Sequence, residues 1–271
     1  MTTTAQPTTA ELGRARKRKE DARLITGQTR WTDNLMLPGM LHLAVVRSPL
    51  AHAKITRINT DAAKRLPGVH GVFTAVDLGA EAINMPCAWQ ITPDMKAPQA
   101  PPLAFDTVHF AGEGVAIVVA RDAASAADAA DAVEVDYDGL APVLDMEAAL
   151  ADGATLVHPE LGTNRNALWI FDSGQVGSGG NVEDAIRNAE VVIKRRFRQQ
   201  RLIPAFMEPR SVVVDPTGEQ LTMWSATQIP HILRFALAAT TGVPESKIRV
   251  IAPDVGGGFG GKLQVTPEEW V

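Results

Sequence analysis

The stretch GVAIVVARDAASAADAADAVEVDYD (114–138) limits the folds open to this chain more than any other. Its residues 115–120 are apolar throughout and predict a strand, and residues 132–137 predict a second one. Between them, residues 122–131 are rich in alanine and predict a helix, whose short side chains would let it lie close against a sheet. A strand, a helix and a strand in succession predict a mixed α/β (α+β) fold.

The residues before this unit continue the same pattern. Three strands are expected, at 40–48, 53–60 and 71–76. A short helix should begin near Asp61, because Thr60 or Asp61 can cap it, and should end at Pro67 and Gly68. The prolines within 86–102 remove backbone donors and fix φ, so this part is expected to be an irregular surface loop.

The chain is expected to divide into two domains. Residues 1–20 form a polar tail, and the elements over 21–150 would make the first domain. Residues 151–164 have little periodicity and many turn formers, so the boundary is placed there. The second region would then cover 165–271.

The second region is predicted to mix strands and helices. Strands are expected at 167–172, 190–200, 211–215, 220–225 and 246–252, with the turn of a hairpin at 215–218. A glycine-rich loop at 173–181 should open a helix at 182–189. A second helix is expected at 230–242, because Pro230 stands in its first turn and Gly242 follows its end.

The composition argues against several classes of protein. The single cysteine, Cys87, allows no internal disulfide, and no Cys/His spacing predicts a zinc or iron–sulfur site held by this chain. The six histidines are scattered, and no directly ligated metal is expected. The net charge of −5 argues against general nucleic-acid binding. Because the basic N-terminus lacks a following apolar run and no stretch is apolar enough to span a bilayer, we expect a cytoplasmic protein.

The glycine run VGGGFGGK (255–262) fits two phosphate-binding patterns at once. Residues 256–261 satisfy GxGxxG and residues 256–262 satisfy GxxxxGK. A P-loop needs Ser or Thr after its lysine to bind Mg²⁺, but Leu263 stands there, so a phosphate-binding NTPase ranks last. A dinucleotide fingerprint needs a helix and a later acidic residue, and Pro267 follows too closely for this to be tested.

The loop nevertheless predicts an exposed backbone whose N–H groups could approach an anion or an oxo ligand. A tight turn without a ligand is the alternative. Gln228 is a second candidate, because its amide can donate to an oxygen ligand without titrating, although it could instead bond the loop backbone. Glu208 and Arg210 are expected to form an ion pair that holds a loop.

Five segments in order resemble the large, molybdenum-binding subunit of the xanthine dehydrogenase, aldehyde oxidase and aerobic carbon-monoxide dehydrogenase family. They are EDARLITGQTRWTDNLMLPGMLHLAVVRSPLAHAKI, GEGVAIVVARDAASAADAADAVEVDYDGLAPVLD, MEPRSVVVD, WSATQIPH and VGGGFGGK, and together they span about residues 20–269. The set looks most like the bacterial carbon-monoxide-dehydrogenase-like branch. Several ordered motifs are more specific than any one of them.

The resemblance implies an α/β hammerhead domain over 21–150 and the start of a molybdopterin-binding domain over 165–271. It implies that Gln228 hydrogen-bonds a molybdenum oxo ligand and that the backbone of Gly257, Gly258, Phe259, Gly260 and Gly261 lies against the cofactor. The cofactor would be molybdenum–molybdopterin, in the cytosine dinucleotide form. An iron–sulfur small subunit and an FAD-binding medium subunit would be the partners, in a complex that dimerises.

The implied reaction is oxidation of an aldehyde, an N-heterocycle or carbon monoxide, with water as the oxygen source. Leu263 stands where purine hydroxylases have a glutamate, which weakens the case for purines. The family's catalytic glutamate would lie beyond Val271, so the chain by itself is expected to be inactive and to expose apolar faces. The rival interpretation is a non-catalytic assembly or scaffold subunit that keeps the hammerhead domain.

Overall fold

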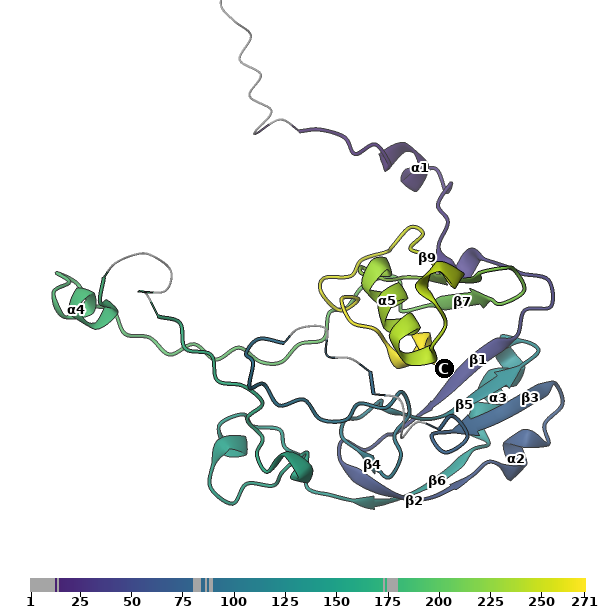
Figure 1. Cartoon of the computed structure of the whole chain (residues 1–271), viewed down its shortest axis with the longest axis horizontal. Coiled ribbons are helices and arrows are strands. Elements are labelled where there is room, and N and C mark those ends of the chain that lie inside the picture. Colours follow the sequence, from purple (N-terminus) through teal and green to yellow (C-terminus); the bar gives the residue numbers. More distant parts are fainter. Residues whose placement is uncertain are drawn as a thin grey trace, which may run out of the picture.

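The computed structural model describes residues 13, 15–79, 84–85, 87, 90–172, 174 and 180–271 (Figure 1). Much of the expected tail and most of the glycine-rich loop at 173–181 therefore lie outside the described residues. The described chain forms two sheets in its N-terminal half and a third near its C-terminus. Figure 1 shows the third sheet stacked above the other two, with a long segment that carries α4 extending to one side.

The first sheet has the order β1-β5-β3, with antiparallel neighbours. Its strands are β1 (His42–Arg47), β3 (Val69–Thr74) and β5 (Gly114–Ala120). The helix α3 (Ala123–Asp131) covers this sheet through the buried Ala126 and Ala129, as the alanine pattern predicts. Asp122 caps α3 by accepting a hydrogen bond from the Ser125 N–H at 2.7 Å. The strand, helix and strand predicted within 114–138 are thus confirmed.

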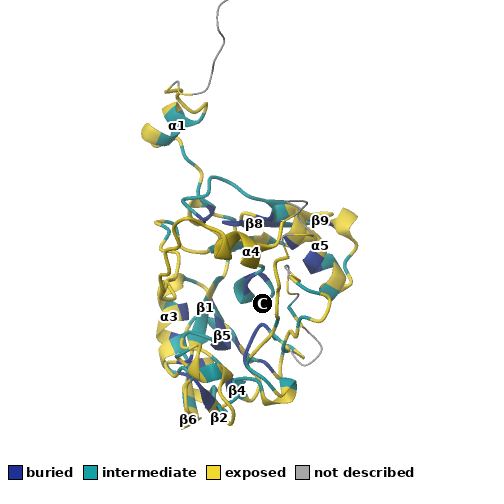
Figure 2. Cartoon of the chain, turned by 90° about the vertical axis from the view of Figure 1, so that its left-hand side faces the viewer, coloured by how far each residue is buried: buried dark blue, intermediate teal, exposed yellow. Residues whose placement is uncertain are grey.

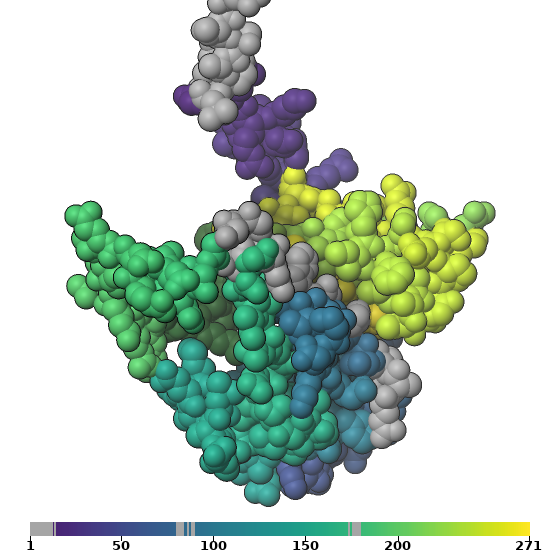
Figure 3. Space-filling model, turned by 60° about the vertical axis from the view of Figure 1, so that its left-hand side comes forward, coloured from purple at the N-terminus to yellow at the C-terminus, as the bar shows by residue number. Residues whose placement is uncertain are grey.

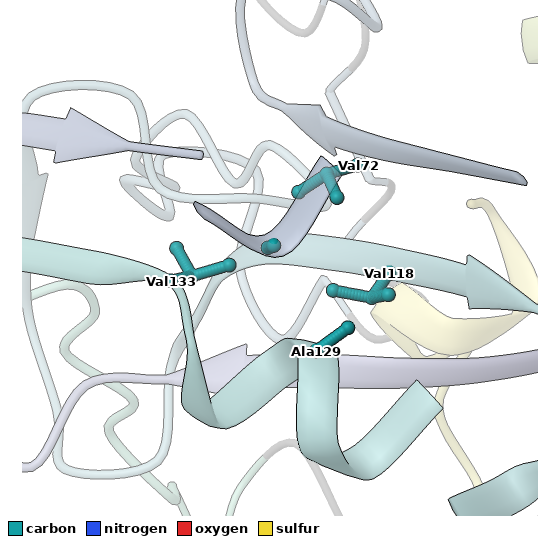
Figure 4. Close-up of a cluster of buried hydrophobic side chains, with 5 residues drawn as sticks. Val72, Val118, Ala129 and Val133 are labelled. Carbon is teal, nitrogen blue, oxygen red and sulfur yellow. The ribbon is translucent and has the colours of Figure 1, made fainter. Parts of the chain in front are cut away.

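The core of this half lies between α3 and the sheet. Val118, in the middle of β5, contacts Ala129 of α3, and Val72 and Val133 complete the cluster (Figure 4). The short helix α2 (Asp61–Lys64) closes the cluster with the fully buried Ala63. Its N-cap residue is Thr60, but the side-chain bond to its first turn comes from Asn59, which accepts from the Asp61 N–H at 3.1 Å.

The second sheet has the order β4-β2-β6 and is also antiparallel. Its strands are β2 (Ala53–Asn59), β4 (Thr107–Val108) and β6 (Glu134–Gly139). The side chains of Ala53, Val108 and Val115 pack together between this sheet and β5. This contact joins the two N-terminal sheets into one body.

The third sheet has the order β7-β8-β9. The hairpin of β7 (Val212–Asp215) and β8 (Leu221–Ser225) is antiparallel, and β8 pairs in parallel with β9 (Ile248–Ile251). The helix α5 (Pro230–Thr241) makes the crossover between β8 and β9. It begins at Pro230 and ends before Gly242, whose φ is +72°, as the sequence predicts.

The remaining helices are short. They are α1 (Asp21–Ile25), α4 (Val182–Arg187) and the 3₁₀ turns η1 (Thr32–Asn34), η3 (Ala148–Leu150), η4 (Pro159–Leu161), η5 (Glu245–Lys247) and η6 (Pro267–Glu269). None of the helices in the described part of the chain is both long and apolar enough to span a bilayer.

The described residues of 165–203, called the arm below, differ from the expected strands. The described residues of 167–172 and 190–200 form no strand, so those two predictions are wrong, and α4 buries none of its residues. Figure 2 colours α4 and the chain around it as exposed, and Figure 3 shows this segment standing out from the rest of the molecule. Two exposed ion pairs, Arg196 with Glu147 and Arg198 with Asp145, attach it to the preceding chain.

The C-terminal end of the chain packs back on the N-terminal half. Glu268, just after β9 and its loop, forms an ion pair with Arg47 at the end of β1. Val271 packs against the cluster of Ala75, Leu103 and Ile117. These contacts hold the third sheet next to the first.

Candidate functional site

The glycine loop leaves β9 and turns sharply. Gly257 and Gly260 have φ of +100° and +84°, and Phe259 has a φ of +47°. Among the described residues, Phe259 is the only residue other than glycine with a positive φ. A large L-residue in this region is strained, and the 2.6 Å bond from the Gly261 N–H to the Gly258 carbonyl holds the turn closed.

The Phe259 side chain lies outside this turn and is 76% exposed. The ring lies near Gly257, where an added Cβ would come within 3.0 Å of it. Phe259 is therefore accessible at the surface of the loop.

Gln228 follows β8 and lies directly against the loop. Its backbone N–H donates to the Lys262 carbonyl at 3.0 Å, and its side-chain oxygen accepts from the Lys262 N–H at 3.3 Å. A Cβ added to Gly258 would lie 2.5 Å from the Gln228 Cδ, so any side chain there would displace the Gln228 amide. The sequence analysis left open that Gln228 bonds the loop backbone. Its side-chain oxygen does so, by accepting from the Lys262 N–H.

The Nε2 end of the Gln228 amide remains available as a hydrogen-bond donor. Because the Gln228 oxygen must accept from the Lys262 N–H, its Nε2 group is the donor. No acceptor for Nε2 is found in the part of the chain that the structure describes. The side chain is exposed, so this donor can meet a group from outside the chain.

The predicted ion pair between Glu208 and Arg210 is wrong. Glu208 instead pairs with Lys262 at 3.0 Å, and Arg210 donates to the Gly261 carbonyl at 2.7 Å. The reason is geometric: in the extended segment before β7, Glu208 and Arg210 are two residues apart and both contact the loop, at different points. The sequence did not predict that the loop lysine would be the partner of Glu208.

A buried carboxylate below the loop was also missed. Glu269 accepts from the Ser225 hydroxyl at 2.5 Å and from the Thr266 N–H at 2.8 Å. Burial raises the pKa of this carboxyl, while those hydrogen bonds oppose the rise. The capping box from Thr266 to Glu269 was the sequence signal that could have placed it.

Three of the six histidines come together away from the loop. His52, His109 and His158 stack in a column, with ring centroids 6.2 Å and 4.3 Å apart, beside an open cavity of about 1160 Å³. Within the described residues, no three or more of His, Cys, Asp and Glu are placed to hold a metal ion. Because the three histidines lie far apart in the sequence, no local pattern predicted that their rings would stack.

The Glu113 carboxylate, whose Oε2 lies 3.7 Å from the His109 Nδ1, raises the pKa of His109, although burial opposes the rise. Burial, followed by the charge of His109, lowers the pKa of His158. The column therefore favours one charged and one neutral ring, side by side.

Taken together, the loop and Gln228 present N–H donors on a closely packed and strained backbone. Such an arrangement suits an anionic or oxo-bearing group rather than a cation. The absence of a Cβ at Gly258 and the available Nε2 donor of Gln228 both fit the cofactor end that the sequence resemblance implies. The structure therefore brings Gln228 and residues 257–261 to one place.

Comparison with protein families gives two matches that together cover most of the chain. Residues 26–141 match the aldehyde oxidase and xanthine dehydrogenase a/b hammerhead domain. Residues 157–271 match the molybdopterin cofactor-binding domain.

Individual relatives agree with these matches. The chain is 38% identical over 259 residues to the carbon monoxide dehydrogenase large chain of Hydrogenophaga pseudoflava, which covers 92% of this chain and 31% of that protein. It is 37% identical over 260 residues to the nicotine 6-hydroxylase large subunit of Paenarthrobacter nicotinovorans, covering 95% of this chain and 31% of that one. The chain thus spans about a third of the length of these curated relatives.

Solved structures show the same fold. Quinoline 2-oxidoreductase from Pseudomonas putida 86 superposes with a TM-score of 0.82 at 36% identity, over 93% of this chain and 31% of that chain. Reconstituted CO dehydrogenase from Oligotropha carboxidovorans gives a TM-score of 0.77 at 36% identity, over 94% and 32%.

Proposed function

Because this chain belongs to the family of molybdenum-binding large subunits of xanthine dehydrogenase, aldehyde oxidase and carbon monoxide dehydrogenase, we propose that its glycine loop holds the metal end of a molybdenum–molybdopterin cofactor. The observation that carries the proposal is the close packing of Gln228 on Gly258, which leaves the Gln228 Nε2 as a donor. Gln228, Gly257, Gly258, Phe259, Gly260 and Gly261 are the proposed cofactor-binding residues.

These residues would act by holding donors in place. The Gln228 Nε2 would donate to an oxo group, and N–H groups of residues 257–260 would face its negative charge. The strained turn fixes these donors before a ligand arrives, so little reorganisation is needed on binding. When bound, the cofactor supplies the oxidation chemistry, with water as the source of oxygen.

The substrate class and the partners are part of the same proposal. Two large subunits that are similar to this chain carry the names of carbon monoxide dehydrogenase and nicotine 6-hydroxylase. We propose an aldehyde, an N-heterocycle or carbon monoxide as substrate, and the cytosine dinucleotide form of the pterin. An iron–sulfur subunit and an FAD subunit would carry the electrons away, in a dimerising cytoplasmic complex.

We further propose two domains, over 21–150 and 165–271, and no catalytic side chain in this chain. Glu208, the carboxylate nearest the loop, is engaged by Lys262 and by the Gly256 N–H at 2.7 Å. Both of these contacts hold its Oε2 oxygen in place against the loop. The isolated chain is therefore expected to be inactive.

The test is the cofactor content of the complex purified through a tag on this chain. We expect molybdenum and pterin in amounts matching the chain, and a loss of about 10- to 100-fold in Gly258→Ala, because the new Cβ displaces Gln228. Gly139→Ala is the matched control, since an added Cβ there meets nothing within 4 Å. A wild-type complex without molybdenum or pterin would favour the scaffold alternative instead.

A further inference from the structure

We propose that the buried ion pair between Glu208 and Lys262 sets the shape of the glycine loop, and that these two are positioning residues for the donors on it. The inference rests on the proposed function only for the identity of the ligand. The loop itself, and its response to changes in the pair, can be measured without any ligand.

One carboxylate oxygen holds both ends of the loop. The Glu208 Oε2 accepts from the Gly256 N–H at 2.7 Å and from the Lys262 ammonium at 3.0 Å. Gly256 is the first glycine of the run 255–262, and Lys262 is its last residue. In addition, the Glu208 N–H donates to the Gly256 carbonyl at 3.2 Å. The separation of the loop ends therefore depends on this side chain.

The segment that carries Glu208 is built to face the loop. Phe206, Glu208 and Arg210 alternate with residues that point away, such as Met207, which is 95% exposed. The Lys262 ammonium lies 4.6 Å from the centre of the Phe206 ring, a cation–π distance. Arg210 holds the Gly261 carbonyl at 2.7 Å.

The pair is too buried to tolerate the loss of one partner. The side chains of Lys262 and Glu208 are 1% and 12% exposed. Removing one charge leaves the other buried without a partner, which costs much more than an exposed pair contributes. A Cβ added at Gly256 would lie 2.5 Å from the Glu208 Cβ, so the loop and the segment that carries Glu208 approach each other closely.

Lys262 also links the loop to Gln228. Its N–H donates to the Gln228 oxygen and its carbonyl accepts from the Gln228 N–H, at 3.3 Å and 3.0 Å. A shift of Lys262 would therefore rotate the amide whose Nε2 is the available donor. The pair thus controls both the loop N–H groups and the side chain facing them.

If the Glu208–Lys262 pair only stabilised the fold, it would lie in the core of the third sheet. The apolar cluster that holds the third sheet is formed by Met223, Leu233, Leu237 and Ile248. Glu208 and Lys262 lie on irregular chain outside this cluster. Changes to the pair are therefore expected to loosen the loop before they loosen β8 or α5.

The experiment is hydrogen exchange on the complex purified through this chain, comparing wild type with Glu208→Gln, Lys262→Met and the double variant. We expect the amides of residues 256–263 to exchange about tenfold faster or more in each single variant, while those of β8 keep their rates. The double variant should recover part of the protection, because no charge is left unpaired. Molybdenum content should fall in the same order as loop protection.

Arg57→Met is the matched control, because it removes one partner of an exposed ion pair with Asp136, with Arg57 57% exposed. It should change none of these rates. Unchanged loop exchange in both single variants would overturn the inference, and so would equal loosening of the loop and β8. If wild type holds no molybdenum but its loop responds as described, the inference stands and the proposed function fails. If molybdenum is present and loop exchange is unchanged in the variants, the inference fails and the proposed function stands.

Discussion

Two apolar stretches of this chain behave in opposite ways. Strand β5 (Gly114–Ala120) lies between β1 and β3, and all its residues but one are buried. Residues 190–200 begin with an apolar run and were expected to be a strand too, yet they form no strand in the structure, and Ile193 is 76% exposed. The comparison teaches that β-branched residues favour a strand only where a partner edge exists to receive it.

The same contrast extends to the arm as a whole. Its exposed apolar side chains include Leu168, Trp169, Ile170, Phe171, Phe197, Leu202 and Ile203. Burial of apolar area is the main favourable term in folding, and these residues gain little of it here. We therefore predict that the isolated chain needs a partner or aggregates, and the exposed side chains of the arm are the physical basis of this prediction.

The contrast between the buried core and the exposed arm is tested most sharply by replacing one leucine in each with alanine. Leu103 is 1% exposed against Ala75 and Ile117, while Leu202 of the arm is 67% exposed. We expect Leu103→Ala to lower the free energy of unfolding by about 2–5 kcal/mol. Leu202→Ala should change it by less than about 0.5 kcal/mol. Urea denaturation of the 271-residue chain measures both, and equal losses would mean that the arm is packed in solution.

A smaller effect is expected from two helix caps of the same kind. Asp122 caps α3, which packs on the sheet, and Asn181 caps α4, which buries none of its residues. Asp122→Ala should lower the free energy of unfolding by about 1 kcal/mol, because α3 unfolds with the core. Asn181→Ala should fray α4 alone and leave that free energy unchanged. Helix content by circular dichroism and urea denaturation separate the two outcomes, and a global loss in Asn181→Ala would contradict the contrast.

The smallest expected effect is a pH dependence at the joint between the N-terminal sheets and the chain leading to the arm. His109 has a raised pKa, so its contribution to stability is complete below its ordinary value of 6.5 and is lost as pH rises through the raised pKa. His158 has a lowered pKa, so burying it begins to destabilise as pH falls below 6.5 and does so fully below the lowered pKa. Together they give a stability maximum between the two pKa values.

The substitution His158→Gln should remove only the loss on the acid side. Urea denaturation across pH, with imidazole NMR titration to follow each ring, is the measurement. An acid-side loss that is the same in wild type and His158→Gln would show that the column has no role in it.

Local elements followed closely from the sequence. The helix α5 has its Pro230 start and its Gly242 end, and the unit of β5, α3 and β6 lies within two residues of its expected bounds. Periodicity and caps are set by residues a few positions apart, which is why they can be predicted from sequence. The family resemblance, drawn from ordered motifs, is confirmed by the hammerhead and cofactor-domain matches.

By itself, then, the sequence determined the α/β class, the main helices and the family. Only the tertiary structure decided which strands found partners, that Lys262 rather than Arg210 pairs with Glu208, and that His52, His109 and His158 stack. Each of these depends on segments far apart in the chain meeting at a few ångströms. No local pattern encodes such a meeting, because its free energy arises only when the fold has brought both partners out of water.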